Sequence, residues 1–389
     1  MATVLTTPAP KVPQQPSWVD PWLAARVRRE LEAAPMIARP SDTMVLAERL
    51  AEVAAGRRQV LQAGDCAERP TDCVPSVLSR KLDQIETLAT VMSWRSGLPT
   101  ERVGRIAGQF AKPRSAPYET VGDVKLPVFR GMMINGATAD PGARCHDPLR
   151  LLHALSWSAR GAAWLDSQAE ISGCRTWTSH EALVLDYEVP LLRQHSDGRT
   201  FLTSTHWPWI GDRTRDPEGA HVSLLARVAN PVAVKVGPGV SIETLMRLCE
   251  RLDPDRTPGR LTLIARLGNE LVRGALPPLM RAVREAGHPV IWLCDPMHAN
   301  TVVTVRGLKT RYVDRVRDEV VGFAEAAAEA GVHAGGLHLE ATPFQVRECV
   351  TSPHDADRLS SEHYTSLCDP RLNPGQAMDI ARAWGGGEA

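Results

Sequence analysis

Short apolar runs rich in β-branched residues recur along the chain, and most are followed by a polar turn and a longer segment of helical periodicity. A run of this kind is typical of a buried strand, whereas apolar residues repeating every three to four positions predict an amphipathic helix. The pattern predicts strands at residues 59–64, 102–108, 175–179, 200–205, 231–236, 261–267, 289–294 and 335–339.

Helices are predicted between these strands. The clearest covers 76–94 behind Pro75, and others cover 241–252, 272–286 and 313–330. Two more helices are predicted within 17–56, before the first strand. Ser41, which precedes Asp42, is expected to cap the second of these two. The apolar stripe of this region is formed by Trp18, Trp22, Val27 and Leu31.

Eight strands alternating with helices predict a (β/α)8 TIM barrel with an N-terminal helical extension. The same alternation also suits an open, doubly wound sheet. We divide the chain into a flexible or draped arm at 1–16, the helical extension at 17–56 and a catalytic barrel at 57–389. The arm is rich in Pro and Thr.

Composition narrows the classes of function. The 389 residues carry no formal net charge, which argues against non-specific binding to nucleic acid or to an anionic membrane. No apolar run approaches the roughly 20 residues of a membrane helix. The eight cysteines are scattered without paired spacing, so we expect free thiols and a cytoplasmic protein. Neither a G-x-G-x-x-G nor a P-loop motif is present.

Nearly every predicted strand ends in a polar or charged residue, and in a barrel the carboxyl ends of the strands form one catalytic rim. One set of these residues is cationic. Such a set predicts bound anions, such as a phosphorylated acid and a second phosphorylated molecule. The plainer interpretation is a series of ordinary ion pairs. The set consists of Arg105, Lys112, Arg114, Arg213, Lys235 and Arg266.

A second set offers one soft and three harder metal donors: Cys66, His298, Glu340 and Asp369. These donors suit Mn²⁺, Co²⁺, Fe²⁺ or Zn²⁺, and such a metal would polarise an aldehyde oxygen. Each residue is a weak signal by itself, because a lone Cys is usually a small buried hydrophobe.

Around these residues the sequence resembles the type II 3-deoxy-D-arabino-heptulosonate-7-phosphate (DAHP) synthases, most closely the short form of phenazine and related secondary-metabolite clusters. The similarity runs from about residue 17 to 384 in the order of the family. The matching stretches are 62–68, 105–115, 179–188, 209–215, 219–221, 234–238, 259–266, 294–298, 336–340 and 368–373.

The resemblance implies a metal-dependent transferase that condenses phosphoenolpyruvate with erythrose 4-phosphate, the first step of the aromatic pathway. It also implies a divalent metal as cofactor, Mn²⁺, Co²⁺ or a similar ion, and we expect a homodimer. By matching position, the metal ligands are Cys66, His298, Glu340 and Asp369. The phosphoenolpyruvate contacts are Arg105, Asp212 through its backbone, Arg213, Lys235 and Arg266. The erythrose 4-phosphate contacts are Lys112, Arg114, Ser115 and Asn135.

Lys112, Arg105 and Lys235 are the expected catalytic residues, with Lys112 or a metal-bound water as proton donor. Between 130 and 179 the chain is shorter than the primary-metabolism forms, which suggests insensitivity to aromatic feedback. Met132 replaces an acidic residue of the family pattern. Two further hypotheses therefore stay open: a synthase for a modified aldose phosphate, and a non-catalytic barrel that serves as a partner subunit.

Overall fold

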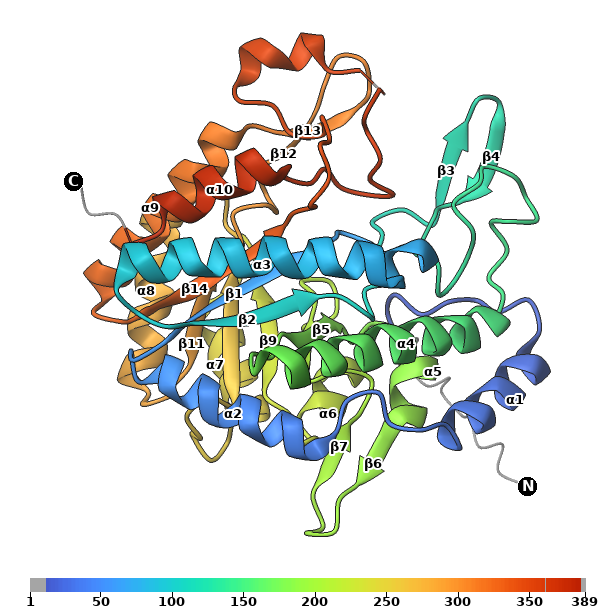
Figure 1. Ribbon diagram of the computed structural model, residues 1–389, viewed down its shortest axis with the longest axis horizontal. Helices are drawn as coiled ribbons and strands as arrows, with labels where there is room; N and C mark the ends of the chain where they lie inside the picture. Colours follow the sequence, from blue (N-terminus) through green and yellow to red (C-terminus); the bar gives the residue numbers. More distant parts are fainter. Residues whose placement is uncertain (1–11, 361, 386–389) are drawn as a thin grey trace, which may run out of the picture.

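Eight parallel strands close into a barrel in the computed structural model of the chain, which describes residues 12–360 and 362–385 (Figure 1). The first strand pairs with both its successor and the last strand, which excludes the open sheet. In spatial order the strands are β1 (Gln59–Gly64), β2 (Thr100–Arg105), β5 (Trp177–Glu181), β8 (Trp207–Ile210), β9 (Val232–Val236), β10 (Leu261–Ala265), β11 (Ile291–Cys294) and β14 (Ala334–Glu340).

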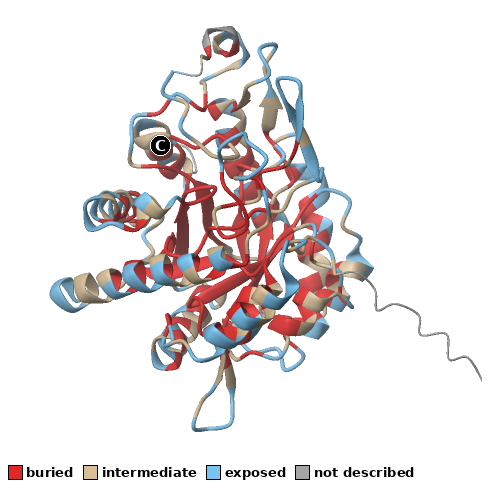
Figure 2. Cartoon of the chain, turned by 90° about the vertical axis from the view of Figure 1, so that its right-hand side faces the viewer, coloured by how far each residue is buried: buried red, intermediate tan, exposed pale blue. Residues whose placement is uncertain are grey.

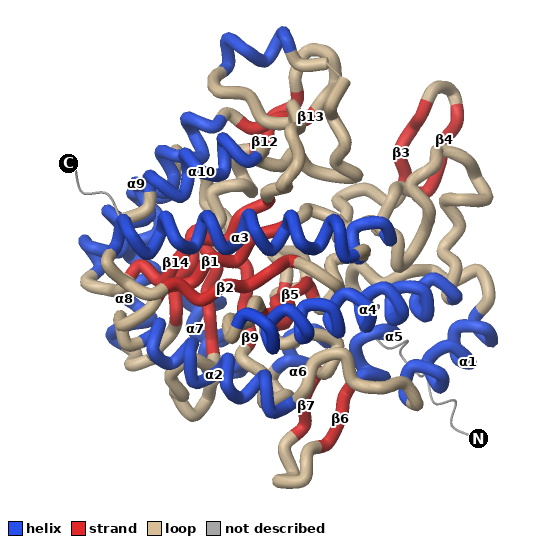
Figure 3. Tube along the Cα trace, viewed as in Figure 1, coloured by secondary structure: helices blue, strands red, loops and turns tan. Residues whose placement is uncertain are grey.

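Helices surround the strands, which form the buried centre of the molecule (Figures 2 and 3). The α-helices are α1 (Pro21–Glu32), α2 (Pro40–Ala54), α3 (Pro75–Ser96), α4 (Leu149–Ser172), α5 (Leu185–Glu188), α6 (Ala220–Leu225), α7 (Ile242–Leu252), α8 (Val272–Glu285), α9 (Val313–Ala330) and α10 (Pro374–Ala383). Short 3-10 helices are η1 (Pro70–Cys73), η2 (Val189–Leu191) and η3 (Pro353–Arg358).

Three two-stranded hairpins lie outside the barrel. They are formed by β3 (Tyr118–Val121) with β4 (Val124–Pro127), β6 (Leu192–Gln194) with β7 (Thr200–Leu202), and β12 (Thr301–Val303) with β13 (Lys309–Arg311). The first and third hairpins belong to the loops that follow β2 and β11, so they lie on the side of the barrel where the strands end (Figure 1).

Helix α2 packs across the end of the barrel where the strands begin. Its Leu46, Leu50 and Val53 are fully buried and join one hydrophobic cluster with Val60 and Trp207 of the barrel. With this end closed, substrates must reach the barrel from the carboxyl ends of its strands.

The predicted fourth strand was wrong. Residues 200–205 contribute only β7, which pairs antiparallel with β6, and the fourth barrel strand is β8. Pro208 lies within β8, and a proline has no N–H to donate to a sheet, so its presence argues against a strand in a sequence pattern. The second and third strands were placed correctly, with ends shifted by two or three residues.

Two details of the helical extension also differ. Ser41 lies inside α2, whose N-cap is Arg39, because Pro40 occupies the first helical position and needs no N–H partner. Trp22 is 88% exposed, since the buried stripe of α1 consists of Ala24, Val27 and Leu31. Of the predicted arm, residues 1–11 lie outside the described residues, whereas residues 12–16 drape over the barrel.

Each of the eight cysteines is a free thiol, as their scattered spacing predicted. Among the described residues, no helix has the length and apolar character needed to cross a membrane.

Candidate active site

Most of the predicted site residues gather at the carboxyl ends of the strands, around two adjoining pockets. The deep pocket is lined by Arg105, Glu181 and Lys235, and the outer pocket by Arg114 and Ser115. The outer pocket has a volume of about 410 Å³. The residues that line both pockets are Lys112, Pro113, Arg213, Arg266, His298 and Asp369.

Three of the four predicted metal ligands form a close group, and the fourth lies beside one of them. Ligand atoms of Cys66, Glu340 and Asp369 are all within 4.8 Å of one another. The Nε2 atom of His298 is 3.5 Å from Oε1 of Glu340. Strand ends explain this convergence, since Cys66 follows β1 and Glu340 ends the neighbouring β14.

The position of Lys112 shows that these donors can surround a positive charge. Its ammonium lies 3.3 Å from Oε1 of Glu340 and 3.7 Å from Oδ2 of Asp369. Burial opposes the charge, but Cys66, Glu340 and Asp369 raise the pKa of Lys112 well above its ordinary value. The cluster therefore favours positive charge, and its thiol, imidazole and carboxylates form a donor set suited to a first-row divalent metal.

Two further cationic side chains form ion pairs with the carboxylates of this cluster. Arg311 lies 2.8 Å from Oε2 of Glu340, and Lys309 lies 2.9 Å from Oδ1 of Asp369. Neither residue was predicted from the sequence, because both lie in hairpin strand β13 and not at the end of a barrel strand.

Cys66 is fully buried, and its sulfur accepts a hydrogen bond of 3.2 Å from the backbone N–H of Asp369. Burial, a hydrogen bond with the Cys368 thiol and the charge of Glu340 raise the pKa of Cys66 well above its ordinary value. Since a metal binds the thiolate, binding at this site would release a proton.

Arg105 is held in place by a neutral histidine. Burial and the nearby Lys235 and Arg105 hold the pKa of His338 well below its usual range. Nε2 of His338 therefore accepts a hydrogen bond of 2.7 Å from Arg105, while Nδ1 donates one of 2.6 Å to Gln62. The guanidinium also lies over the ring of Trp209.

Asp295, for which the sequence predicted no role, links Lys235 to His298. Its carboxylate pairs with the Lys235 ammonium and accepts a hydrogen bond of 2.8 Å from Nδ1 of His298. This bond leaves Nε2 of His298 facing Glu340, the arrangement that usually orients a metal-binding histidine. Burial lowers the pKa of Lys235 to about 8.

The loop after β8 joins the two pockets. Arg213 donates a hydrogen bond of 2.7 Å to the Ser115 hydroxyl. The Asp212 carboxylate accepts hydrogen bonds from Arg215 at 2.9 Å and from Arg266 at 3.1 Å. Asp212 thus orients a predicted phosphoenolpyruvate contact through its side chain, whereas the resemblance implied only its backbone.

Glu181 lines the deep pocket, although the sequence predicted no role for it. Burial raises its pKa, and its buried Oε1 has no hydrogen-bond partner among the described residues. A Cβ atom at Gly211 would lie 2.1 Å from that oxygen, so a larger residue at this position would displace the Glu181 carboxylate. Glu181 could have been identified from its position at the end of a strand, because it ends β5 and lies two residues beyond the predicted strand.

Asn135, predicted to contact the acceptor sugar, does not face either pocket. It is fully buried, and its amide donates to the carbonyls of Val128 and Arg144 and accepts from the N–H of Arg130. Met132, the departure from the family pattern, does not line the pockets either.

Comparisons with known proteins identify the family to which the sequence is similar. The model of the Class-II DAHP synthetase family matches residues 6–171 and 159–384. A probable phospho-2-dehydro-3-deoxyheptonate aldolase of Pseudomonas fluorescens is 50% identical over 376 residues, which cover 95% of this chain and 94% of that protein. A phospho-2-dehydro-3-deoxyheptonate aldolase of Mycolicibacterium smegmatis is 39% identical over 424 residues, covering 95% and 90%.

The fold is also similar to a solved structure. A phospho-2-dehydro-3-deoxyheptonate aldolase from Francisella tularensis SCHU S4 superposes with a TM-score of 0.58, covering 97% of both chains. Its sequence is only 11% identical, so this likeness concerns the barrel architecture alone.

Proposed function

The chain belongs to the Class-II DAHP synthetase family, and on that premise we propose that it condenses phosphoenolpyruvate with erythrose 4-phosphate to give DAHP and inorganic phosphate. One observation carries the proposal: the pocket that is lined by Arg105, Arg213, Lys235 and Arg266 is also lined by His298 and Asp369, which lie beside Cys66 and Glu340. Such an arrangement provides neighbouring binding sites for a dianionic phosphate, a carboxylate and a cation.

The deep pocket is the proposed site of phosphoenolpyruvate. Guanidinium groups bind phosphate and carboxylate through paired hydrogen bonds, and Lys235 adds a point charge. The pairs that His338 makes with Arg105 and that Asp212 makes with Arg266 orient these groups before substrate arrives. Held in this way, the C3 carbon of the enol is kept at attacking distance from the acceptor.

The outer pocket is the proposed site of the aldose phosphate. Arg114 and Ser115 line the outer pocket but not the deep pocket, and the terminal phosphate would bind to them. Lys112 lies on the wall shared by the two pockets, next to the place where the aldehyde would meet the enol.

A divalent cation, which we propose to be Mn²⁺ or Co²⁺, would be held by Cys66, His298, Glu340 and Asp369 and would supply Lewis-acid polarisation of the aldehyde. The new bond joins C3 of phosphoenolpyruvate to the aldehyde carbon, and Lys112 is placed to donate a proton to the resulting alkoxide. Water adds at C2, and phosphate leaves with its bridging oxygen. Glu181, in the deep pocket, is placed to accept the proton of that water.

The test is a steady-state assay of phosphate release with a panel of aldehyde phosphates and divalent metals. We expect release to require both erythrose 4-phosphate and a metal. Turnover with a modified aldose phosphate but not with erythrose 4-phosphate would overturn the proposed acceptor. Met132 is not among the described residues that line either pocket, so its position does not favour that alternative.

We further propose that the product feeds a secondary metabolite such as a phenazine, and that the protein works in the cytoplasm. The short segment between 130 and 179 supports the first, and the free thiols support the second. The first proposal can be tested in an aromatic auxotroph whose growth is supported by added aromatic amino acids. The measurement is whether the metabolite is produced when this protein is expressed.

A further inference from the structure

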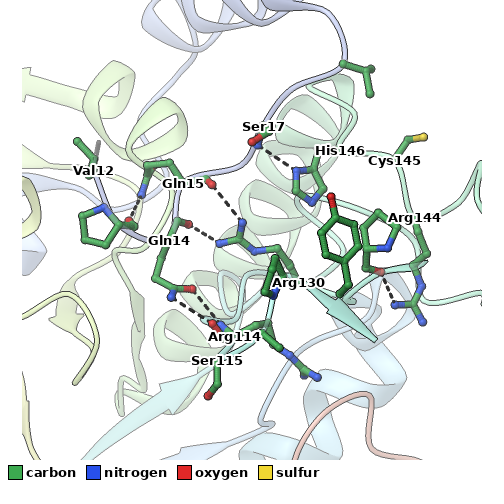
Figure 4. Close-up of a pocket in the computed structure, with 16 residues that line it drawn as sticks. Val12, Gln14, Gln15, Ser17, Arg114, Ser115, Arg130, Arg144, Cys145 and His146 are labelled. Carbon is green, nitrogen blue, oxygen red and sulfur yellow. Dashed lines mark hydrogen bonds between the residues drawn. The ribbon is translucent and has the colours of Figure 1, made fainter. Parts of the chain in front are cut away.

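An N-terminal strap, residues 12–19, lies against the loop that carries Arg114 and Ser115 (Figure 4). Arg130 anchors the strap by donating hydrogen bonds to the carbonyls of Gln14, at 2.5 Å, and Gln15, at 3.1 Å. Further along, the backbone N–H of Ser17 donates to Nδ1 of His146 at 3.0 Å. The strap is therefore fixed to the body of the protein at several points.

The side chain of Gln14 pairs with both backbone groups of Arg114. Its Nε2 donates to the Arg114 carbonyl at 3.1 Å, and its Oε1 accepts from the Arg114 N–H at 3.0 Å. Within the part of the chain that the structure describes, neither backbone group of Arg114 has another hydrogen bond. The side-chain amide of Gln14 thus makes both backbone hydrogen bonds of Arg114.

Packing does little to replace these bonds. Residues 115–118 are exposed, and a cavity of about 550 Å³ lies between the strap and the loop. The nearest fixed points of the loop are the Lys112 N–H, which donates to the Arg130 carbonyl, and the Ser115 hydroxyl, which accepts from Arg213. Between these two points, Gln14 is the contact that sets the path of the backbone.

The backbone of Gln14 supports a specific role. Its φ is +61°, which is a left-handed backbone conformation that residues other than glycine rarely adopt. Strain of this kind persists where surrounding contacts over-determine the conformation, and it clusters at functional sites. Here the conformation lets the Gln14 carbonyl reach Arg130 while its side chain reaches Arg114.

We propose that Gln14 is a positioning residue for the acceptor phosphate: through the backbone of Arg114, it sets where the Arg114 guanidinium and the Ser115 hydroxyl meet that phosphate. This inference rests on the proposed function. It also gives the buried Asn135 an indirect part, since Asn135 accepts a hydrogen bond from the N–H of Arg130, which holds the strap.

The experiment compares Gln14→Met with the wild type. Methionine keeps the length of the side chain but removes both hydrogen bonds. We expect the KM for erythrose 4-phosphate to rise roughly five- to tenfold, as expected for two lost hydrogen bonds, with the KM for phosphoenolpyruvate and kcat within twofold. Ser17→Ala is the matched control, because Ser17 is exposed and contacts His146 through its backbone alone. It should leave all three constants unchanged.

A second measurement separates this inference from the proposed function. Hydrogen–deuterium exchange of the peptide containing Arg114 should be faster in Gln14→Met than in wild type, whatever the substrate is. Equal KM values for erythrose 4-phosphate, or an equal rise for both substrates, would overturn the inference. If the wild-type protein shows no turnover, the proposed function fails, and unchanged exchange at Arg114 would still overturn the role of Gln14.

Discussion

Two buried carboxylates at the strand ends have acid strengths that differ because their neighbours differ. Burial opposes ionisation of Glu340, but Lys112, His298 and Arg311 hold its pKa well below the usual range. Burial also raises the pKa of Glu181, and the cations near it offset only part of that rise. Environments that move two acids apart are typical of sites where one binds a cation and the other transfers a proton.

Replacing Glu181 by Gln should lower kcat by roughly 10²-fold, because an amide cannot accept the proton of the attacking water. The KM values of both substrates should change little, since the amide retains the shape of the side chain. In the wild type, the rate should fall at low pH as Glu181 becomes protonated, at a pH above the ordinary range for glutamate. The Glu181→Gln enzyme should lack that limb of its pH–rate profile.

Glu218→Gln is the control for this change, because Glu218 is exposed and its carboxylate pairs with Arg247 on the surface. Its kinetics should equal those of the wild type. An unchanged kcat in Glu181→Gln would remove Glu181 from the mechanism and leave the water without an assigned base.

At the scale of elements, helix α9 holds two active-site loops through one buried carboxylate. Oε1 of Glu319 accepts hydrogen bonds from the N–H groups of Leu267, at 3.1 Å, and Gly268, at 2.8 Å. Its Oε2 accepts one of 2.6 Å from the amide of Asn300. These loops follow β10 and β11 and carry Arg266 and His298, so α9 fixes their relative position.

The bounds of α9 agree with the prediction of 313–330, because its apolar spacing is regular. Glu319 was nevertheless overlooked, although it lies on the same helical face as the buried Val316, Val320 and Phe323. A single acidic residue on an apolar helical face indicates a buried role, but a search for apolar periodicity ignores it. The error over β8 has the opposite origin, since there a single proline concealed a strand.

Glu319 should make the stability of the fold depend on pH. Burial raises its pKa to about 8, above the roughly 4.3 of an unfolded chain. Between these values the folded protein binds more protons than the unfolded chain, so stability falls as pH rises through this window. In Glu319→Gln, the loss of unfolding free energy between pH 6 and pH 8 should be smaller by about 2 kcal/mol.

Urea unfolding followed by tryptophan fluorescence at both pH values measures this difference. Glu325→Gln provides the control, because Glu325 lies on the exposed side of the same helix and pairs with Arg273. It should keep the slope of the wild type. The same slope in Glu319→Gln would show that another group is responsible.

At the scale of the whole molecule, the sequence predicted the barrel and the residues at its strand ends. It succeeded because the topology of a barrel brings all carboxyl ends to one rim, whichever residues lie between them. Contacts made by a hairpin or by the N-terminal strap could not be predicted in this way. Lys309 and Arg311 arrive from a hairpin and Gln14 from the N-terminal strap, and no periodicity of the chain relates them to the rim.

The proposed metal ligands connect parts of the barrel that are far apart in sequence. Cys66 follows the first strand, Glu340 ends the last strand beside it, and Asp369 lies in the loop before α10. A ligand that binds only the folded state stabilises it in proportion to the logarithm of its concentration. A divalent cation held by these residues should therefore stabilise the closure of the barrel as well as the site.

Mn²⁺ at about 100 times its Kd should stabilise the folded protein by about 2.7 kcal/mol and raise Tm by a few degrees, and EDTA should reverse the change. Cys66→Ser should lose most of this rise, because it removes the soft ligand. Cys145→Ser, a change at an exposed thiol, should retain it. Differential scanning fluorimetry without substrate measures all three proteins, so the result does not depend on which aldehyde the enzyme uses. An equal rise in Cys66→Ser would place the cation elsewhere and leave the closure of β1 against β14 to hydrogen bonds and packing alone.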